Sequence, residues 1–306
     1  MNLVAAPRTV VIVGASTAGA SAAATLRTEG FDGRVVLVGE EPVLPYERPP
    51  LSKTFLAGAA TLESFLLRPE SFWADHDVDL RLGVRATEID TRTRTVALND
   101  GSRLTADAVI VATGGRSRSL DVPGTELDGV FGLRTVADAT AIRARAAEAT
   151  QAVVVGMGFI GAEAAASLRG LGLQVTVVEP LSAPLERVLG EEVGTLIADL
   201  HAEHDVRMIF GDTVVGFDGV DGRVREVAIS SGQRLPADLV IVGVGMVPET
   251  TLLADTDVEL RNGVVVDEFT RTRVPGIYAA GDVANHYHPL YARYVRTEHW
   301  THAIEH

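Results

Sequence analysis

The sequence has 306 residues, of which 46% are hydrophobic and 22% are charged, and its formal net charge is −14. This length and composition are typical of a globular, soluble protein with two domains. The negative charge disfavours a nucleic-acid partner, whose phosphates require a basic surface. The absence of cysteine excludes disulfides, thiolate-held iron–sulfur clusters and dithiol centres within this chain, so redox chemistry requires a bound cofactor. No apolar run is long enough to span a membrane and no signal peptide is recognisable, so we expect a cytoplasmic protein.

The first forty residues carry a dinucleotide-binding pattern. The predicted elements are a strand at 10–13, a helix at 20–27 and a strand at 34–38. Gly14 permits a sharp turn after the first strand, Gly19 permits close helix packing, and Glu40 can accept hydrogen bonds from ribose hydroxyls. The helix N-terminus attracts a pyrophosphate. Ser16 replaces the middle glycine of the pattern and would crowd the pyrophosphate slightly. The alternative is an ordinary strand–helix–strand unit without a ligand.

A proline-rich loop follows the second strand. Four prolines between positions 42 and 50 exclude a regular helix or a central strand there. Such a stiff, charged loop is either a functional loop or a rigid linker. Further strands are predicted at 78–82, 85–90, 95–98 and 108–111. The sequence Asn99-Asp100-Gly101 predicts a hairpin turn between two of them.

The opening pattern recurs in the second half of the chain. The predicted elements are a strand at 152–155, a helix at 162–171 and a strand at 174–178 that ends at Glu179. Between the first two lies a complete GxGxxG motif, from Gly156 to Gly161. Segments 104–114 and 235–245 also align. In each, an aspartate lies three residues after the first residue, and the strand ends at a glycine. Two related nucleotide-binding units explain this repeat better than coincidence does.

The last part of the chain contains two more predicted strands, at 263–267 and 277–280. The second delivers Asp282 to the carboxyl edge of a sheet, where open α/β sheets bind ligands. The tail that follows is aromatic and basic. It contains five histidines: His286, His288, His299, His302 and His306. Their spacing fits no common metal-ligand pattern and no cysteine accompanies them, so we predict no metal site.

Several motifs together resemble a known family. They are the two glycine turns, Tyr46-Glu-Arg-Pro-Pro-Leu-Ser-Lys53, Ala112-Thr-Gly114, Tyr278-Ala-Ala-Gly-Asp282 and Arg296-Thr-Glu-His-Trp300. On these motifs the chain, from about Val10 to its last residue, resembles the FAD-dependent NADH:ferredoxin and rubredoxin reductases of oxygenase systems. These are flavoproteins of the pyridine nucleotide-disulfide oxidoreductase superfamily that lack the redox cysteines.

The resemblance implies an α/β fold with two Rossmann-like, glutathione-reductase-like domains. Residues 1–115 and 247–306 would form a discontinuous FAD-binding domain, and residues 116–246 an NADH-binding domain. Family members commonly continue into a small α+β domain, whereas this sequence stops at His306, so we expect that domain to be absent. Ala183 stands where relatives often carry a basic residue, for which Arg187 would partly substitute.

The resemblance also implies the FAD site. Its expected residues are Gly14, Ser16, Ala18, Gly19, Glu40, Arg48, Lys53, Thr113, Gly114, Asp282, Val283, Glu298 and Trp300. Arg48 and Lys53 would lie near the flavin ring and the phosphates, and Asp282 would bind the ribityl chain. Trp300 would lie beside the isoalloxazine, under a loop that carries Glu298, or it would be a core or rim aromatic.

The expected NADH site lies in the second unit. Its residues would be Gly156, Gly158, Ile160, Gly161, Glu163, Glu179, Arg187 and Gly245. Glu179 would accept from the ribose 2′-hydroxyl and repel the 2′-phosphate of NADPH, or it would be an exposed strand-end acid. Lys53, Glu163 and Trp300 are the expected catalytic residues, with Glu163 near the nicotinamide and paired with Lys53. The alternative for Lys53 is a solvated surface charge.

The predicted reaction is hydride transfer from NADH to FAD, followed by single-electron transfer to a [2Fe–2S] ferredoxin that feeds a cytochrome P450 or a ring-hydroxylating dioxygenase. Alternative acceptors are rubredoxin, oxygen and a quinone. A different class of function is an NADH-responsive flavoprotein switch that resembles apoptosis-inducing factor. Four arginines would offer a basic face to an acidic ferredoxin, or bind phosphates or solvent: Arg116, Arg118, Arg293 and Arg296. We expect a monomer or homodimer with no membrane partner.

Overall fold

The computed structural model describes residues 7–306, which form two compact units. Unit 1 contains the residues up to 47 together with 65–116 and 248–306, and unit 2 contains 48–64 and 117–247. Segment 48–64, which begins with the end of the proline-rich loop, therefore groups with unit 2, whereas the sequence placed it in the first domain. No helix in the described part of the chain has the length and apolar character needed to cross a bilayer.

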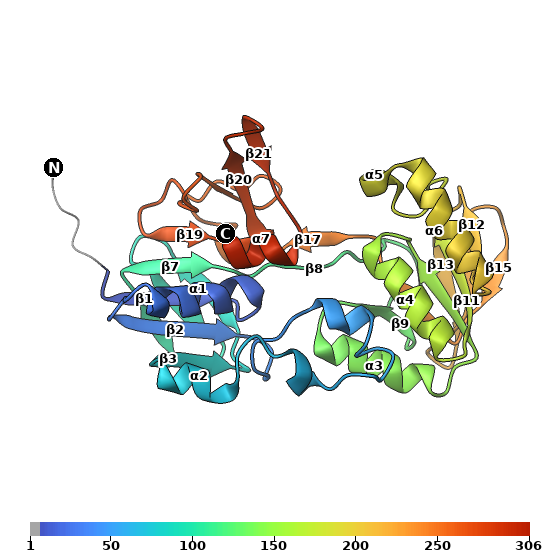
Figure 1. Cartoon of the computed structure of the whole chain (residues 1–306), viewed down its shortest axis with the longest axis horizontal. Helices are drawn as coiled ribbons and strands as arrows, with labels where there is room; N and C mark the ends of the chain where they lie inside the picture. The colour runs from blue at the N-terminus through green and yellow to red at the C-terminus, as the bar shows by residue number, and fades with distance from the viewer. Residues whose placement is uncertain (1–6) are drawn as a thin grey trace. The chain divides into compact units, whose positions relative to one another are not determined.

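Unit 1 is built on a parallel five-stranded sheet in the order β19-β7-β1-β2-β3. Its strands are β1 (Thr9–Val13), β2 (Arg34–Gly39), β3 (Val78–Leu82), β7 (Ala108–Val111) and β19 (Ile277–Ala279). In Figure 1 this sheet joins strands from the blue start and the red end of the chain. Successive β1 residues point to opposite faces, and both faces are apolar and buried. Val10 and Ile12 join one core cluster, and Val11 and Val13 join another.

Helices and small sheets cover the two faces of the unit 1 sheet. The helices are α1 (Thr17–Thr28), α2 (Glu70–Asp75) and α7 (Trp300–Glu305), with 3₁₀ turns η3 (Thr251–Leu253) and η4 (Gly281–Val283). An antiparallel sheet contains β4 (Ala86–Asp90), β5 (Thr95–Leu98) and β6 (Arg103–Thr105), and a mixed sheet contains β18 (Val264–Val266), β20 (Ala284–His288) and β21 (Arg293–Val295). The predicted hairpin turn at Asn99-Asp100-Gly101 is confirmed, but it joins β5 to β6, a strand that the sequence did not predict, and not to the strand at 108–111.

Unit 2 repeats this plan. Its parallel sheet has the order β12-β11-β10-β16-β9, and β13-β14-β15 form an antiparallel sheet. The strands are β9 (Val130–Gly132), β10 (Gln151–Val155), β11 (Gln174–Glu179), β12 (Arg207–Phe210), β13 (Val214–Val220), β14 (Arg223–Ile229), β15 (Arg234–Pro236) and β16 (Leu239–Val242). The helices are α3 (Val136–Ala146), α4 (Phe159–Gly170), α5 (Glu186–Leu189) and α6 (Glu191–Glu203), with η1 (Pro49–Ser52) and η2 (Leu62–Phe65). The remaining strands, β8 (Gly115–Ser117) and β17 (Met246–Pro248), pair with each other.

The strand order β7-β1-β2-β3 of unit 1 corresponds to β16-β10-β11-β12 of unit 2. In each unit a three-stranded antiparallel sheet precedes the strand that returns beside the first one. This confirms the predicted repeat and the α/β fold with two Rossmann-like units.

The two helices after the glycine turns begin earlier than the sequence suggested. α1 starts at Thr17 rather than Ala20, and α4 starts at Phe159 rather than Ala162. The last glycine of each motif therefore lies inside the first helical turn rather than before it. A Cβ on Gly19 would lie 1.9 Å from the Gly14 carbonyl oxygen, so the glycine permits a tight start to the helix.

Candidate functional site

The glycine turn of unit 1 connects β1 to the N-terminus of α1. Gly14 has φ +113°, and a Cβ there would lie 2.2 Å from the Ala112 carbonyl oxygen. Folding therefore requires glycine at Gly14 and Gly19, whether or not a ligand binds. Ser16 is the N-cap of α1, whose first backbone amides form a potential anion site.

In the corresponding turn of unit 2, two glycines are required by the fold and a third leaves space for a ligand. Gly156 has φ +88°, and a Cβ on Gly161 would lie 2.0 Å from the Gly156 carbonyl oxygen. A Cβ on Gly158 would instead meet no atom within 4 Å, and Gly158 has φ −73° as the N-cap of α4. Neither packing nor backbone conformation requires a glycine at this position. Glycine at 158 keeps the helix N-terminus open to a ligand.

Ser16 occupies the position that corresponds to Gly158. The backbone is similar, with φ −93° and ψ −163° at Ser16 and φ −73° and ψ −170° at Gly158. Serine at this position therefore adds a side chain to the turn without backbone strain. The predicted crowding of a pyrophosphate by Ser16 stays a prediction.

Glu40 and Glu179 are not equivalent, contrary to the sequence comparison. Strand pairing aligns Val13 with Val38 and Val155 with Val178, so Glu179 corresponds to Gly39 and Glu40 comes one residue later. Glu40 is exposed and forms a 3.6 Å ion pair with Arg85. The repeated pattern therefore does not place the two acids alike.

Glu179 is buried and holds the glycine turn of unit 2. It accepts hydrogen bonds from the backbone N–H groups of Met157 (2.6 Å) and Leu181 (3.0 Å). The alternative of an exposed strand-end acid is wrong. A carboxylate has about four acceptor positions, so Glu179 can still accept from a ribose.

Residues from distant parts of unit 1 meet beside its glycine turn. A Cβ on Gly281 would lie 2.6 Å from the Cβ of Ala18, so the start of α1 packs against η4, which carries Asp282. The Thr113 hydroxyl donates to the Glu249 carbonyl (2.6 Å), and Gly114 has φ +62°.

Val283 also lies in η4, but its side chain is fully buried in the core, so only its backbone is available to a ligand.

The segment before α7 is fixed by Arg296. Its guanidinium forms a 2.7 Å ion pair with Glu298 and donates to the Asp282 carbonyl oxygen (3.2 Å), and its side chain is 10% exposed. Arg296 therefore contributes no basic surface, contrary to the suggested ferredoxin face. Trp300, the first residue of α7, is half exposed and is free of the buried core.

The other three arginines of the suggested basic face differ in their surroundings. Arg116 forms an ion pair with Glu249 (3.6 Å), and Arg118 donates to the Met246 carbonyl oxygen (3.4 Å). Arg293 is exposed and lies over the ring of Tyr291.

A polar cluster links η1 to α4 within unit 2. The Lys53 ammonium lies 3.1 Å from Glu163 Oε1, and the Ser52 hydroxyl donates to Glu163 Oε2 (2.5 Å). Ser167 donates to the Ser52 carbonyl oxygen (2.7 Å). The suggested Lys53–Glu163 pair is thus present, and Lys53 is the only lysine in the sequence. No sequence motif marks Ser52 or Ser167, because the sequence does not show that the loop packs on α4.

Arg48 donates to the Arg134 carbonyl oxygen within unit 2. Arg48 and Lys53 therefore belong to a different compact unit from the other expected FAD residues. Among the remaining expected NADH residues, Ile160 and Arg187 lie near the turn of unit 2. Ile160 is exposed in the first turn of α4 and Gly245 has φ +101°. The Leu185 N–H donates to the Met157 carbonyl (2.9 Å), which holds the segment leading into α5 and exposed Arg187 beside the turn.

Three of the five tail histidines come together in unit 1. His286, His302 and His306 each offer a nitrogen, and these atoms lie within 4.8 Å of one another. Burial lowers the pKa of His286 and His302, and lowers the pKa of His306 to about 4. The signal in the sequence for this cluster is the four-residue spacing of His302 and His306, which places them on one helix face.

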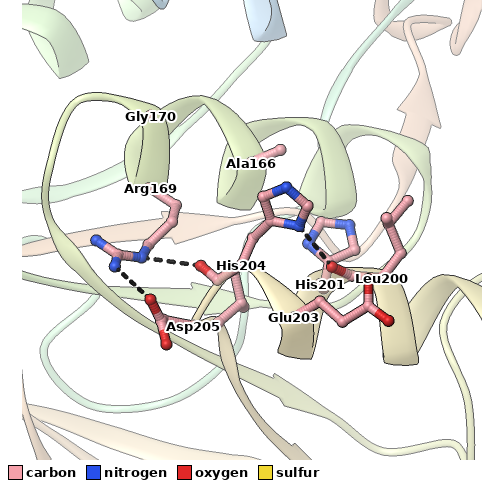
Figure 2. A pocket seen from close by; sticks show the side chains of 9 residues that line it. Ala166, Arg169, Gly170, Leu200, His201, Glu203, His204 and Asp205 are labelled. Carbon is pink, nitrogen blue, oxygen red and sulfur yellow. Dashed lines mark hydrogen bonds and ion pairs between the residues drawn. The ribbon is translucent and has the colours of Figure 1, made fainter.

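A cavity of about 550 Å³ lies between the C-terminal end of α4 and the end of α6. Figure 2 shows Arg169 in this pocket, bound to the His204 carbonyl oxygen (3.0 Å) and the Asp205 carboxylate (3.0 Å). α4 has 12 residues and is therefore roughly 18 Å long, so the pocket lies far from the glycine turn at its other end. The negative end of the helix dipole also disfavours phosphates there. None of the expected site residues lines this pocket.

Two repeated units, each with a glycine turn at a helix N-terminus, define an α/β protein of the two-dinucleotide-binding class. The sequence profile described as "Pyridine nucleotide-disulphide oxidoreductase" matches residues 8–306, and the chain belongs to this family of oxidoreductases.

Similar proteins agree with this assignment. Rhodocoxin reductase of Rhodococcus erythropolis is 41% identical over 296 residues, which cover 97% of this chain and 69% of the relative. The ferredoxin reductase component of chlorobenzene dioxygenase from Cupriavidus sp. is 41% identical over 277 residues, which cover 90% of this chain and 67% of the relative. The crystal structure of the covalent putidaredoxin reductase–putidaredoxin complex matches with a TM-score of 0.94 and 38% identity, covering 97% of this chain and 73% of that chain.

Proposed function

We propose that this chain is an FAD-dependent NADH:ferredoxin reductase that supplies electrons to an oxygenase. The observation that carries the proposal is the repeated glycine turn, with fold-required glycines in both units and the open position at Gly158 in unit 2. Two dinucleotides would bind, one in each unit. When bound, FAD would supply the redox chemistry, because it takes a hydride from NADH and releases electrons singly.

The residues of unit 1 fit FAD. Gly14 and Gly19 shape the turn that presents the α1 amides to the pyrophosphate. Asp282 is carried by η4, which packs against Ala18 at the start of the same helix, so a hydroxyl-rich chain leaving the pyrophosphate would reach its carboxylate. Half-exposed Trp300 offers an aromatic face to the isoalloxazine. Thr113 and Gly114 would complete the groove.

The residues of unit 2 fit NADH. The α4 amides would bind the pyrophosphate at the open Gly158 position, and Glu179 would accept from the adenosine ribose. A buried carboxylate at this position disfavours the 2′-phosphate of NADPH, which supports a preference for NADH. Glu163 would lie near the nicotinamide, oriented by Ser52 and Lys53.

The electron acceptor is proposed from the relatives. One is named as a ferredoxin reductase component of a dioxygenase, and the solved complex joins a reductase to putidaredoxin. This sequence has no cysteine, so electrons cannot pass through a dithiol of this chain. A [2Fe–2S] ferredoxin is the proposed partner. Monomer or homodimer and a cytoplasmic location stay predictions.

An anaerobic titration with NADH and then NADPH tests the cofactor part of this proposal. We expect NADH to bleach the flavin of the FAD-loaded protein at one equivalent and NADPH to react far more slowly. A panel of ferredoxin, rubredoxin, oxygen and a quinone then ranks the acceptors at one NADH concentration. A long-lived charge-transfer complex with poor turnover on every acceptor would instead favour the NADH-responsive switch.

A further inference from the structure

The His286, His302 and His306 cluster lies outside the residues expected to hold FAD. His286 projects from β20, His302 lies in α7, and His306 caps the end of α7. The ring centroids are 4.9 Å apart for His286 and His302, 4.8 Å for His286 and His306, and 4.5 Å for His302 and His306. The chain thus brings a strand and a helix together through three imidazoles.

The cluster leaves buried nitrogens without hydrogen bonds. In the part of the chain that the structure describes, five buried side-chain nitrogen or oxygen atoms have no partner, and His286 Nδ1 and His302 Nε2 are two of them. A third is Nδ1 of the neighbouring His288. An unmade hydrogen bond at a buried polar atom costs about 1–3 kcal/mol, so such atoms are rare and indicate a missing partner.

His306, the third histidine of the cluster, makes a long hydrogen bond through Nδ1. His306 Nδ1 accepts from the Gly281 N–H at 3.3 Å, which is at the long end of the hydrogen-bond range. Burial favours the neutral form of these rings, in which one nitrogen of each ring carries a lone pair. Neutral imidazole is the form that binds metals.

We propose that His286, His302 and His306 bind one divalent transition-metal ion of the zinc class. Imidazole nitrogen is a preferred ligand of zinc, copper and nickel, and three histidines with a fourth position for water form a common tetrahedral zinc site. Zn–N distances of about 2.0–2.1 Å place ligand nitrogens about 3.3 Å apart in such a site. The present separations of up to 4.8 Å must shorten by roughly 1.5 Å, which side-chain rotation provides.

The metal would fasten α7 to β20. α7 packs against η4 and α1 within unit 1. A metal bridge would fix the position of Trp300 at the start of α7.

The test uses the whole chain after removal of metal with a chelator. ZnCl2 is titrated in competition with a chromophoric chelator, and Co²⁺ absorption reports the coordination geometry. We expect one Zn²⁺ per chain and a four-coordinate Co²⁺ spectrum that Zn²⁺ abolishes. His302→Gln and His306→Gln should each weaken binding by at least about 100-fold, more than the ~10–100-fold typical of outer-shell changes.

His76→Gln is the matched control, because His76 is an exposed histidine of unit 1 outside the cluster. The zinc affinity of this variant should equal that of the wild type. If His302→Gln fails to fold, His306→Gln provides the second, independent variant. Zinc binding of equal strength in the wild type and His306→Gln, or less than one Zn²⁺ per wild-type chain, would overturn the proposal.

Discussion

The Lys53 ammonium lies 3.1 Å from the Glu163 carboxylate, so the only lysine of the sequence pairs with an acid on the helix that follows the second glycine turn. The Ser52 hydroxyl holds the other oxygen of the same carboxylate. A loop that the sequence assigned to the first unit therefore positions a side chain of the second.

Loss of the Lys53 charge should slow flavin reduction with little effect on stability. We expect Lys53→Met to lower the rate of flavin bleaching by NADH about tenfold, which corresponds to about 1.4 kcal/mol of activation free energy. The pair is partly exposed, so the free energy of unfolding should change by less than about 1 kcal/mol. Stopped-flow absorbance measures the rate.

Chemical modification provides the control for Lys53. Acetylation removes the charge of the side-chain amine, and reductive methylation keeps it. Because the chain has one lysine, acetylation should reproduce the Lys53→Met rate and methylation should not. Wild-type rates in both Lys53→Met and the acetylated protein would refute the assigned role.

Gly158 and Gly161 should respond differently to alanine. Gly161→Ala places a Cβ 2.0 Å from a backbone oxygen, so we expect a loss of about 1–3 kcal/mol of stability. Gly158→Ala meets open space and should cost less than about 1 kcal/mol, the usual effect of losing a favourable N-cap residue. It should nevertheless raise the KM for NADH. Thermal unfolding and steady-state kinetics separate the two effects, and an unchanged KM in Gly158→Ala would argue against a pyrophosphate at this turn.

Glu179→Ala should narrow the preference for NADH over NADPH. The variant removes the repulsion of a 2′-phosphate and the acceptor for a ribose hydroxyl. It also leaves the Met157 and Leu181 N–H groups without their partner, so the melting temperature should fall. The ratio of kcat/KM values for the two nucleotides is the measurement. If Tm falls and the ratio does not change, Glu179 only supports the turn.

Asp212 should make unit 2 sensitive to acid. Its carboxylate accepts from the Ser230 hydroxyl (2.5 Å) and the Thr213 N–H (2.8 Å), and these hydrogen bonds lower its pKa from 3.8 to about 2. A depressed folded-state pKa contributes stability above the unfolded-state value, and this contribution is lost as the pH falls from about 4 towards about 2. Asp212→Asn should therefore lower Tm at pH 7. The difference in Tm between the variant and the wild type should be smaller near pH 3. Exposed Asp199→Asn is the control, and equal Tm differences at both pH values would contradict the argument.

Local chemistry explains what the sequence could predict. β-branched runs marked the buried strands, and Gly14, Gly19, Gly156 and Gly161 marked the turns, because close approach of backbone atoms leaves no room for a Cβ. The repeated aspartates also have a structural reason. Asp107 accepts from the N–H groups of residues 8 and 9, and Asp238 from those of residues 150 and 151, so they fix the starts of the equivalent strands β1 and β10.

Contacts between distant segments could not be predicted in the same way. The packing of Ser52 on α4 and the contacts of Arg296 with Asp282 and Asn262 depend on residues far apart in the chain. The one-residue difference between Glu40 and Glu179 follows from strand register, which an approximate motif alignment does not fix. The histidine cluster needs β20 to lie beside α7, and only the His302–His306 spacing could have suggested it.

Ferredoxin-dependent reduction of cytochrome c by NADH is the most direct test of the proposed reductase. The FAD-loaded protein is mixed with NADH and cytochrome c, with and without a [2Fe–2S] ferredoxin. We predict slow reduction without ferredoxin and rapid reduction that saturates as ferredoxin is added. Flavin bleaching by NADH with no increase of the cytochrome c rate at any ferredoxin concentration would contradict the proposed electron transfer to ferredoxin.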